Sequence, residues 1–426
     1  MDYKAFASEA LEKFKSMPEE TDELYKRYFV AMPLEEMGER ARNAETSHKP
    51  EGSIKSNVEA LKRKFDAIIW SGGEMAEQSE YMQIIPIEKV DFENRLTKSG
   101  DDKIAAFIDA HAKRAVQINV PKGAKAKLNL LFVNTSEPLP IQIMINVADD
   151  SSLELFEYYT SDANEKSIVG SLHDIKIGKY ANAEINVVHN EDKNTFVAGW
   201  SKTKVGEKGN LKINFIYNGG SFTRTRNKMD VAGLEGNGEV NELIVSAGEQ
   251  KMDVASNIVN SARDSHAVLE SKAVLMDKSV CVLKGYATIT ETAAQSRSFV
   301  NERGIILDKT AHIDSIPSMS IGNSDVKATH SSATAPIDEE SVFYLMSRGA
   351  TEMEAKRMIV NGFITGMIGK IDDIVVREIV ASIINEKVAT RSFGMVPKIT
   401  TESMWLAGSA HKSSSMFEGH YKYRGE

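Results

Sequence analysis

Hydrophobic and polar residues alternate along the middle of the chain, between about residues 116 and 330. Stretches such as AEINVV, LKINFIY and GEVNELIV place apolar, often β-branched side chains at every second position, and Gly, Asn, Asp and Lys interrupt them. A period of two residues is typical of β-strands, and the interruptions are typical of turns. Helical periodicity is nearly absent here, so this region is predicted to consist of short strands.

The predicted strands also repeat. Similar segments begin at Tyr180 (YANAEIN), Lys208 (KGNLKIN) and Glu235 (EGNGEVN), at intervals of about 28 residues, and a further unit starts at Ser265. Repeats of this length indicate stacked structural units. They favour a β-solenoid, or β-helix, in which each coil buries its inward side chains against the neighbouring coils. A β-sandwich is the alternative arrangement for the same alternation.

Two features of the repeat predict how the coils stack. The turns of three successive units should meet at one corner: Gly178–Lys179, Gly206–Glu207 and Gly236–Asn237. Asparagines also recur at matching positions, namely Asn182, Asn210 and Asn237. Asparagines in such a column are typical of turns or of side-chain ladders between stacked strands.

The first hundred residues have mainly helical periodicity, with some short strands. One predicted helix covers residues 58–70 (VEALKRKFDAIIW), with Asn57 as its N-cap and Leu61, Phe65 and Ile68 on its inner face. A further amphipathic stretch, DDKIAAFIDAHAKR, precedes the strand region.

After residue 337 the pattern returns to helix. Asp338 is a good N-cap, and Glu339 and Glu340 suit the positive end of a helix dipole. Thr351 and Glu354 form a capping box for a second helix.

A third helix is predicted to begin at Asp372 or Asp373. It carries a wide apolar stripe: Val375, Val376, Ile379, Val380, Ile383 and Ile384. The stripe either packs on the solenoid or is half available to a partner.

These patterns divide the chain into four parts. We expect a mainly helical N-terminal domain (1–115), a β-helix core (116–336), a C-terminal helical domain (337–390) and a tail (391–426). The fold class is therefore mainly β, with helical segments on both sides of the β-helix.

Composition narrows the functional classes. The 426 residues carry a formal net charge of −9, which argues against a general nucleic-acid binder. No apolar run is long enough for a membrane helix, and the N-terminus lacks the apolar core of a signal peptide, so a cytoplasmic location is expected. The single cysteine, Cys281, excludes an internal disulfide and any cysteine-rich metal site built by this chain alone.

Known catalytic motifs are absent from the sequence. We find no Walker loop, Rossmann turn, zinc-binding helix signature or nucleophile elbow. Cys281 lies in an alternating run, SVCVLKGYATIT, where a buried thiol acts as a small apolar group.

One C-terminal stretch contains a specific series of residues. In SMSIGNSDVKATHSSATAPIDEESVFYLMSRG, the motifs follow one another without a gap: Asp325-Val326-Lys327, His330, Ile337-Asp338, Phe343-Tyr344 and Ser347-Arg348-Gly349. This series resembles the C-terminal hallmark of the SufB/SufD family of iron–sulfur cluster assembly proteins. The stretch INVPKGAKAKLNLLF (118–132) resembles the entry into the family's β-helix. The resemblance implies a right-handed parallel β-helix between helical ends, in agreement with the repeat.

The resemblance also distinguishes the two types of chain in the family. SufB-type chains carry a cysteine upstream of the histidine and glutamates beside it, whereas SufD-type chains keep the histidine without them. Here Glu302 occupies the position of the SufB cysteine, and Thr329 and Ser331 flank His330, so the chain is similar to SufD. His330 and Glu302 are thus the candidate cluster-assembly residues. His330 is the candidate metal ligand, because a neutral imidazole binds iron well.

The resemblance further implies a scaffold subunit without ATPase activity of its own. Its partners would be a SufB-like paralogue, in a homodimeric or heterodimeric assembly, and a SufC-like ABC ATPase. The ATPase would dock on the C-terminal helices, at Ser347, Arg348, Gly349, Gly362 and Phe363. The implied cofactor is a transient iron–sulfur cluster shared with a partner chain.

A β-helix polysaccharide lyase or hydrolase is the alternative function. Such an enzyme needs carboxylates or basic residues clustered on one face of successive coils. Equivalent coil positions in this sequence repeat only the asparagine column, which favours the scaffold.

Overall fold

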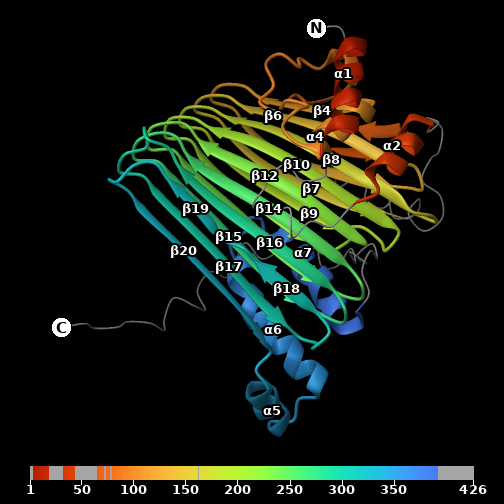
Figure 1. The fold of residues 1–426 in the computed structure, drawn as a ribbon, viewed down its shortest axis with the longest axis vertical. Coiled ribbons are helices and arrows are strands. Elements are labelled where there is room, and N and C mark those ends of the chain that lie inside the picture. Colours follow the sequence, from red (N-terminus) through yellow and green to blue (C-terminus); the bar gives the residue numbers. More distant parts are fainter. Residues whose placement is uncertain are drawn as a thin grey trace, which may run out of the picture.

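The computed structural model describes residues 3–18, 32–43, 65–71, 73–76, 79–161 and 163–391. In these residues the protein is a stack of parallel strands with helices toward both chain ends (Figure 1). The prediction of a mainly β protein built as a parallel β-helix is confirmed, and the sandwich alternative is wrong.

Successive strands alternate between two sheets, so each coil contributes one strand to each sheet. Sheet A has the order β2 (Gly73–Ala76), β1 (Ala67–Trp70), β5 (Lys125–Asn134), β7 (Ser152–Ser161), β9 (Asn182–Asn190), β11 (Asn210–Tyr217), β13 (Asn237–Ser246), β15 (His266–Leu275), β17 (Arg297–Ile306) and β20 (Lys327–Pro336). Sheet B has the order β18 (His312–Ser315), β16 (Val280–Ile289), β14 (Lys251–Asn260), β12 (Phe222–Val231), β10 (Thr195–Val205), β8 (Ser167–Ile177), β6 (Leu139–Val147), β4 (Arg114–Val120) and β3 (Met82–Pro86), and β19 (Ser318–Ile321) also pairs with β16.

The register of sheet A gives the length of a coil. Asn182 pairs with Asn210, Asn210 with Asn237, and Asn237 with His266. The coils in this part therefore contain 27 to 29 residues, which confirms the predicted interval.

One corner of the solenoid repeats an unusual backbone conformation. The residue two positions before a sheet A strand has a positive φ, as in Tyr180 (56°), Lys208 (51°) and Glu235 (54°). This region is unfavourable for residues other than glycine. Hydrogen bonds to the next coil offset the cost: the Tyr180 amide donates to the Glu207 carbonyl (2.9 Å) and the Lys208 amide to the Leu234 carbonyl (2.9 Å). The three predicted turns thus stack at one corner.

Aliphatic side chains from both sheets fill the solenoid interior. Four rings stack along the axis from coil to coil: Phe132, Tyr159, His189 and Tyr217. Their centroids are 4.3, 4.5 and 5.7 Å apart in turn. Each ring is covered by the rings of neighbouring coils, as expected when coils bury each other.

The predicted asparagine column is a hydrogen-bonded ladder on the outer face of sheet A. The Asn210 side-chain amide donates to Asn182 (2.9 Å), and that of Asn237 donates to Asn210 (3.0 Å). A second ladder, which the sequence analysis did not single out, lies four residues further along the same strands. It is buried, and it joins Asn186, Asn214 and Asn241 with bonds of 2.8 and 2.9 Å.

N-terminal helices cover the outer face of sheet B. They are α1 (Tyr3–Ser16), α2 (Leu34–Asn43) and α4 (Lys103–His111), with a 3₁₀ turn at Ile87–Lys89. The buried Arg95 guanidinium binds the Asp109 carboxylate of α4 through two bonds of 2.6 and 2.7 Å. Gln142 of β6 donates to the same carboxylate (2.9 Å), so this network attaches α4 to the sheet.

The predicted helix over 58–70 is wrong at its C-terminal end. Residues 67–70 form β1, which pairs in parallel with β5. All four side chains are buried, and a short continuous apolar run suits a buried strand as well as a helix, so packing decided the outcome. Residues 58–64 lie outside the described part of the chain.

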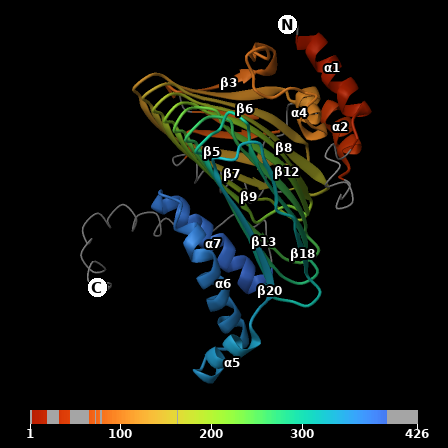
Figure 2. The ribbon, with the colours of Figure 1, turned by 60° about the vertical axis from the view of Figure 1, so that its left-hand side comes forward.

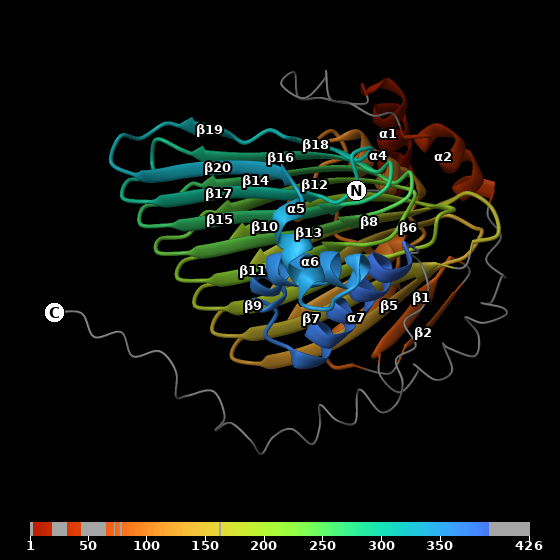
Figure 3. The ribbon, with the colours of Figure 1, turned by 90° about the horizontal axis from the view of Figure 1, so that it is seen from below.

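Three C-terminal helices follow the last coil: α5 (Glu339–Ser347), α6 (Glu352–Ile368) and α7 (Ile374–Thr390). The predicted caps are confirmed: Asp338 caps α5, Thr351 and Glu354 form a capping box on α6, and Asp373 caps α7. α7 and the second part of α6 lie across sheet A (Figure 3), whereas α5 extends away from the solenoid (Figure 2).

The apolar stripe of α7 packs on the solenoid. Five of its six residues are buried, and only Val375 is partly exposed. The buried Lys387 amine donates to the main-chain carbonyls of Asn218 and Val245, which fixes α7 to two coils. Of the two interpretations of the stripe, the structure supports packing on the solenoid.

The buried ladder should contribute more to stability than the exposed one. Asn214→Ala should lower the free energy of unfolding by about 2 kcal/mol, because Asn186 and Asn241 lose their buried hydrogen-bond partner. Asn210→Ala, in the exposed ladder, should lower it by less than about 0.5 kcal/mol. Urea denaturation followed by circular dichroism measures both, and equal effects would contradict the assignment.

Candidate functional site

Among the residues that the structure describes, no coil stacks upon the last coil of the solenoid. β20 pairs with β17 along one edge, and among the described residues no strand pairs with its other edge. Nine of its ten residues are exposed. An exposed strand edge offers unpaired backbone donors and acceptors to another chain. The open end is therefore a candidate site for a partner.

His330 lies within β20, at its fourth residue, and is exposed. It pairs in register with Val300 of β17, which is buried in the solenoid interior. Side chains of paired residues in a parallel sheet point to the same face, so His330 points to the interior side of sheet A. The ring is uncovered because the solenoid ends there. Within the described part of the chain, the ring has no hydrogen-bond partner.

Glu302 occupies the neighbouring strand on the same side of sheet A. It pairs in register with Ser332, two residues beyond His330, and its side chain is fully buried. Ser315 of β18 donates a hydrogen bond to the Glu302 carboxylate, and the Ser315 and Ser332 hydroxyl oxygens are 2.7 Å apart. The structure thus places the two candidate residues on adjacent strands, Glu302 beneath the last coil and His330 on it.

The surroundings of Glu302 favour its neutral form. Burial raises the pKa of Glu302 to about 7, and the nearby Glu242 carboxylate raises it too, while the Ser315 hydroxyl opposes the shift. A Cβ atom at position 285 would collide with Glu302 Oε1, so the glycine there makes room for the carboxyl group. These partners were missed by the sequence analysis, because only the strand register brings them together.

Cys281 is unsuited to binding iron in this fold. It lies fully buried in the interior core. Burial raises the pKa of its thiol well above the ordinary value, and nearby carboxylates add to the shift. Metal binding needs the thiolate. The interpretation of Cys281 as a small apolar core residue agrees with this environment.

The described residues contain no group of three His, Cys, Asp or Glu side chains that could hold a metal ion. At the open end this chain presents the accessible imidazole of His330, beside a buried carboxyl group, and a second exposed histidine, His312, lies in sheet B.

The predicted docking residues fall into two groups. Ser347, Arg348 and Gly349 are exposed at the end of α5, where the Arg348 guanidinium lies 5.3 Å from the Tyr344 ring centroid. Gly362 is exposed on α6, and Phe363 is half-buried.

Phe363 faces the solenoid as well as solvent. The Lys272 amine of β15 donates to its main-chain carbonyl (2.7 Å) and lies 5.1 Å from the ring centroid. Phe363 therefore helps to attach α6 to sheet A.

Exposed apolar side chains lie on the two helices that flank the first docking group. The Phe343 side chain is 73% exposed and lies with four others on α5 and the first part of α6: Tyr344, Met346, Met353 and Met358. We call these five residues the α5 arm surface. Exposed aromatic and methionine side chains in one place are typical of protein contact sites.

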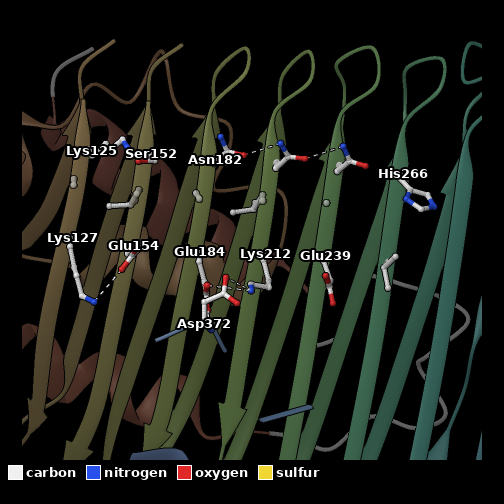
Figure 4. A pocket seen from close by; sticks show the side chains of 18 residues that line it. Lys125, Lys127, Ser152, Glu154, Asn182, Glu184, Lys212, Glu239, His266 and Asp372 are labelled. Carbon is white, nitrogen blue, oxygen red and sulfur yellow. Dashed lines mark hydrogen bonds and ion pairs between the residues drawn. The ribbon is translucent and has the colours of Figure 1, made fainter. Parts of the chain in front are cut away.

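A groove of about 610 Å³ runs along the outer face of sheet A, beside the exposed asparagine ladder (Figure 4). Its charged side chains bind the turn between α6 and α7. Lys212 lies 2.8 Å from Asp372, and Lys370 lies 2.6 Å from Glu239. Burial raises the pKa of Glu184, and its hydrogen bond to Asp372 adds to the shift. The charges of the groove thus serve to attach the C-terminal helices.

Comparison with known proteins agrees with this architecture. A family model described as the SufBD core domain of the SUF system for FeS cluster assembly matches residues 132–363. The chain is 24% identical to the iron–sulfur cluster assembly protein SufD of Bacillus subtilis over 298 residues, which are 68% of each chain.

Two further relatives are SufBD family proteins. The chain is 26% identical over 271 residues to one from Staphylococcus saprophyticus (62% of this chain, 58% of the relative). It is 23% identical over 279 residues to one from Pyrococcus horikoshii (64% of this chain, 62% of the relative). The chain thus spans from 58 to 68% of the length of these relatives. It belongs to the SufB/SufD family of iron–sulfur cluster assembly proteins, and it is SufD-like.

No helix in the described ranges has both the length and the apolar character needed to cross a membrane.

The buried Glu302 should make stability depend on pH. Its pKa in the fold, about 7, lies above the ordinary value of 4.5, so the fold favours the protonated form and loses stability as the pH rises from about 4.5 to above 7. The loss attributable to this group is about 3 kcal/mol. Glu302→Gln should remove it, so the variant should gain stability relative to the natural protein between pH 5 and pH 8.

Urea denaturation at several pH values measures this difference. Asp325→Asn, an exposed carboxylate at the same end of the solenoid, is the matched control and should show no such gain. The two proteins could instead differ in free energy of unfolding by the same amount at every pH. That result would show that Glu302 does not titrate in this range.

Proposed function

We propose that this chain is a SufD-like scaffold subunit, which pairs with a SufB-like chain at the open end of its solenoid and docks a SufC-like ABC ATPase on its C-terminal helices. The observation that carries the proposal is the uncovered last coil, with His330 on its interior side and the α5 arm surface directly after it in the chain. Family membership supports a role in cluster assembly.

The unpaired edge of β20 in the described structure supports pairing at the open end. A second chain that adds a strand there would satisfy the unpaired backbone groups and cover the interior side chains of the last coil. It would also enclose His330, whose ring would then lie between two chains. We infer that His330 supplies one ligand to a transient iron–sulfur cluster, while the SufB-like chain supplies thiolates that this chain lacks.

Glu302 has a supporting role in this arrangement. Its carboxyl group lies beneath the last coil and connects β17 to β18 through the Ser315 hydroxyl. We infer that it fixes the position of the last coil, and with it the position of His330.

The α5 arm surface supports the placement of the ATPase dock. Asp338 begins α5 directly after β20, so a protein bound to this helix would sit next to the open end. The chain itself contains no phosphate-binding loop, so in this proposal the ATPase activity belongs to the partner.

His330 should act in cluster assembly and contribute little to folding. His330→Ala should change the free energy of unfolding by under about 1 kcal/mol and the thermal midpoint by no more than a few degrees, because the ring is exposed. In the complex reconstituted with the SufB-like paralogue and the ATPase, the same change should sharply reduce iron and sulfide content.

His312→Ala provides the matched control, since His312 is an exposed histidine at the same end in sheet B. It should leave iron and sulfide unchanged. Clusters at the natural level in the His330→Ala complex would show that His330 is a structural residue.

The α5 arm surface should be required for ATPase binding. Phe343→Glu and Arg348→Glu should each abolish co-purification with the SufC-like protein without lowering thermal stability, because both side chains are exposed. Phe363→Glu should also weaken binding, but with a loss of stability, since this ring packs beside Lys272. Leu234→Glu, at an exposed corner of the solenoid, is the control. Undiminished co-purification of the first two variants would reject the dock.

A further inference from the structure

The outer face of sheet A changes character over its last three strands, β15, β17 and β20. We define the basic end patch as five outward residues of these strands: Lys272, Arg297, Phe299, Arg303 and Lys327. They lie on the face opposite to Val300 and Glu302, which point into the interior. The register places Arg297 directly beside Lys327, so the patch reaches the terminal strand.

Some cations in the middle of this face pair with carboxylates. Lys127, for example, lies 3.1 Å from Glu154, and Lys212 lies 2.8 Å from Asp372. In the described part of the chain, by contrast, Arg297, Arg303 and Lys327 form no ion pair.

One carboxylate lies among the outward residues of the three strands, that of Glu270. It is engaged by Lys370 of the α6–α7 turn at 2.7 Å. Burial lowers the pKa of Lys272, Glu270 opposes this, and the positive charges of Arg303 and Lys370 lower it further. The patch therefore concentrates positive charge on a chain whose formal net charge is −9.

The shape of the patch points to a protein as its partner. The groove on sheet A ends at His266 and Val268 and does not extend onto β17 or β20. Small ligands bind in concave pockets, whereas a flat sheet surface with an exposed aromatic side chain suits a protein face. Phe299, whose side chain is 39% exposed, lies in the middle of the four cations.

We propose that the basic end patch is a contact surface for an acidic face of the chain that pairs with the free edge of β20. The proposal rests on the pairing put forward under Proposed function. A strand added to β20 would lie about 5 Å from it, so the partner's outward side chains would come next to Lys327 and close to Arg297. Carboxylates at those positions would supply the charges that this face lacks and would speed association.

The same patch disfavours a homodimer through this edge. Two copies related by a two-fold axis would bring two equivalent surfaces together, and with them two sets of unpaired cations. Like charges would then repel, and salt would weaken the repulsion. A higher salt concentration should therefore strengthen self-pairing and weaken pairing with an acidic partner.

The test compares two triple variants with matched loss of charge. One replaces Arg297, Arg303 and Lys327 by Ala. The control replaces three lysines at the turn corner by Ala, each of which pairs with a carboxylate of a neighbouring coil: Lys122, Lys179 and Lys208. Isothermal titration calorimetry measures binding to the SufB-like paralogue, and sedimentation measures self-association, at about 50 mM and about 500 mM NaCl. Circular dichroism verifies the fold of each variant.

The natural protein should bind the paralogue about tenfold more weakly at the higher salt concentration. The patch variant should bind about tenfold more weakly than the natural protein at low salt, with little further salt dependence, and the control should behave like the natural protein. Self-association, where it occurs, should be stronger in the patch variant than in the natural protein at low salt.

Three results would overturn the proposal. Equal affinity of the patch variant and the natural protein for the paralogue at both salt concentrations would show that the patch is not a contact. Loss of ATPase binding in the patch variant, with paralogue binding unchanged, would assign the patch to the ATPase. Absence of any complex with the paralogue at either salt concentration would contradict the pairing itself, and with it the proposed function.

Discussion

The hydrogen-bonded register between successive coils is the interaction on which this structure depends. A single coil cannot bury its inward side chains, so each coil is stable only against its neighbours. The repeated corner shows how strictly the coils are aligned, since residues with side chains adopt a positive φ there and bond to the next coil. The same register aligns both asparagine ladders and the stacked rings.

A stack of coils has two ends, and in this protein the two ends differ in how their strands and side chains are covered. At the N-terminal end, β2 pairs antiparallel with β1 at the margin of sheet A, and β3 pairs antiparallel with β4 at the margin of sheet B. Helices cover the outer face of sheet B. At the C-terminal end no strand of the described ranges pairs with the outer edge of β20, and the chain turns directly into α5. The exposure of His330 is a consequence of this asymmetry: an equivalent residue one coil earlier, Val300, is fully buried. The candidate site is thus the place where the repeat stops.

Electrostatics distinguishes the regions of the outer face of sheet A. In the middle, cations and carboxylates alternate and bind the α6–α7 turn, which positions the C-terminal helices. At the end, the cations have no such partners in the described chain. This difference in charge pairing, beside the edge of β20, is what motivates the proposal that another chain pairs with this end of the solenoid.

The sequence by itself determined the β-helix, its coil length, the exposed asparagine ladder and the caps of α5, α6 and α7, because each depends on short-range periodicity or on side chains that act within a few residues. It also placed His330 in a recognisable series of residues. Only the tertiary structure decided that Ala67–Trp70 is a strand, since a short apolar run suits either element until its neighbour, β5, is known. Only the register brought Glu302, Ser315 and Ser332 together, and only the packing of α6 showed that Phe363 faces Lys272. These contacts join residues on different strands and helices, and no local pattern encodes which strand will lie beside which.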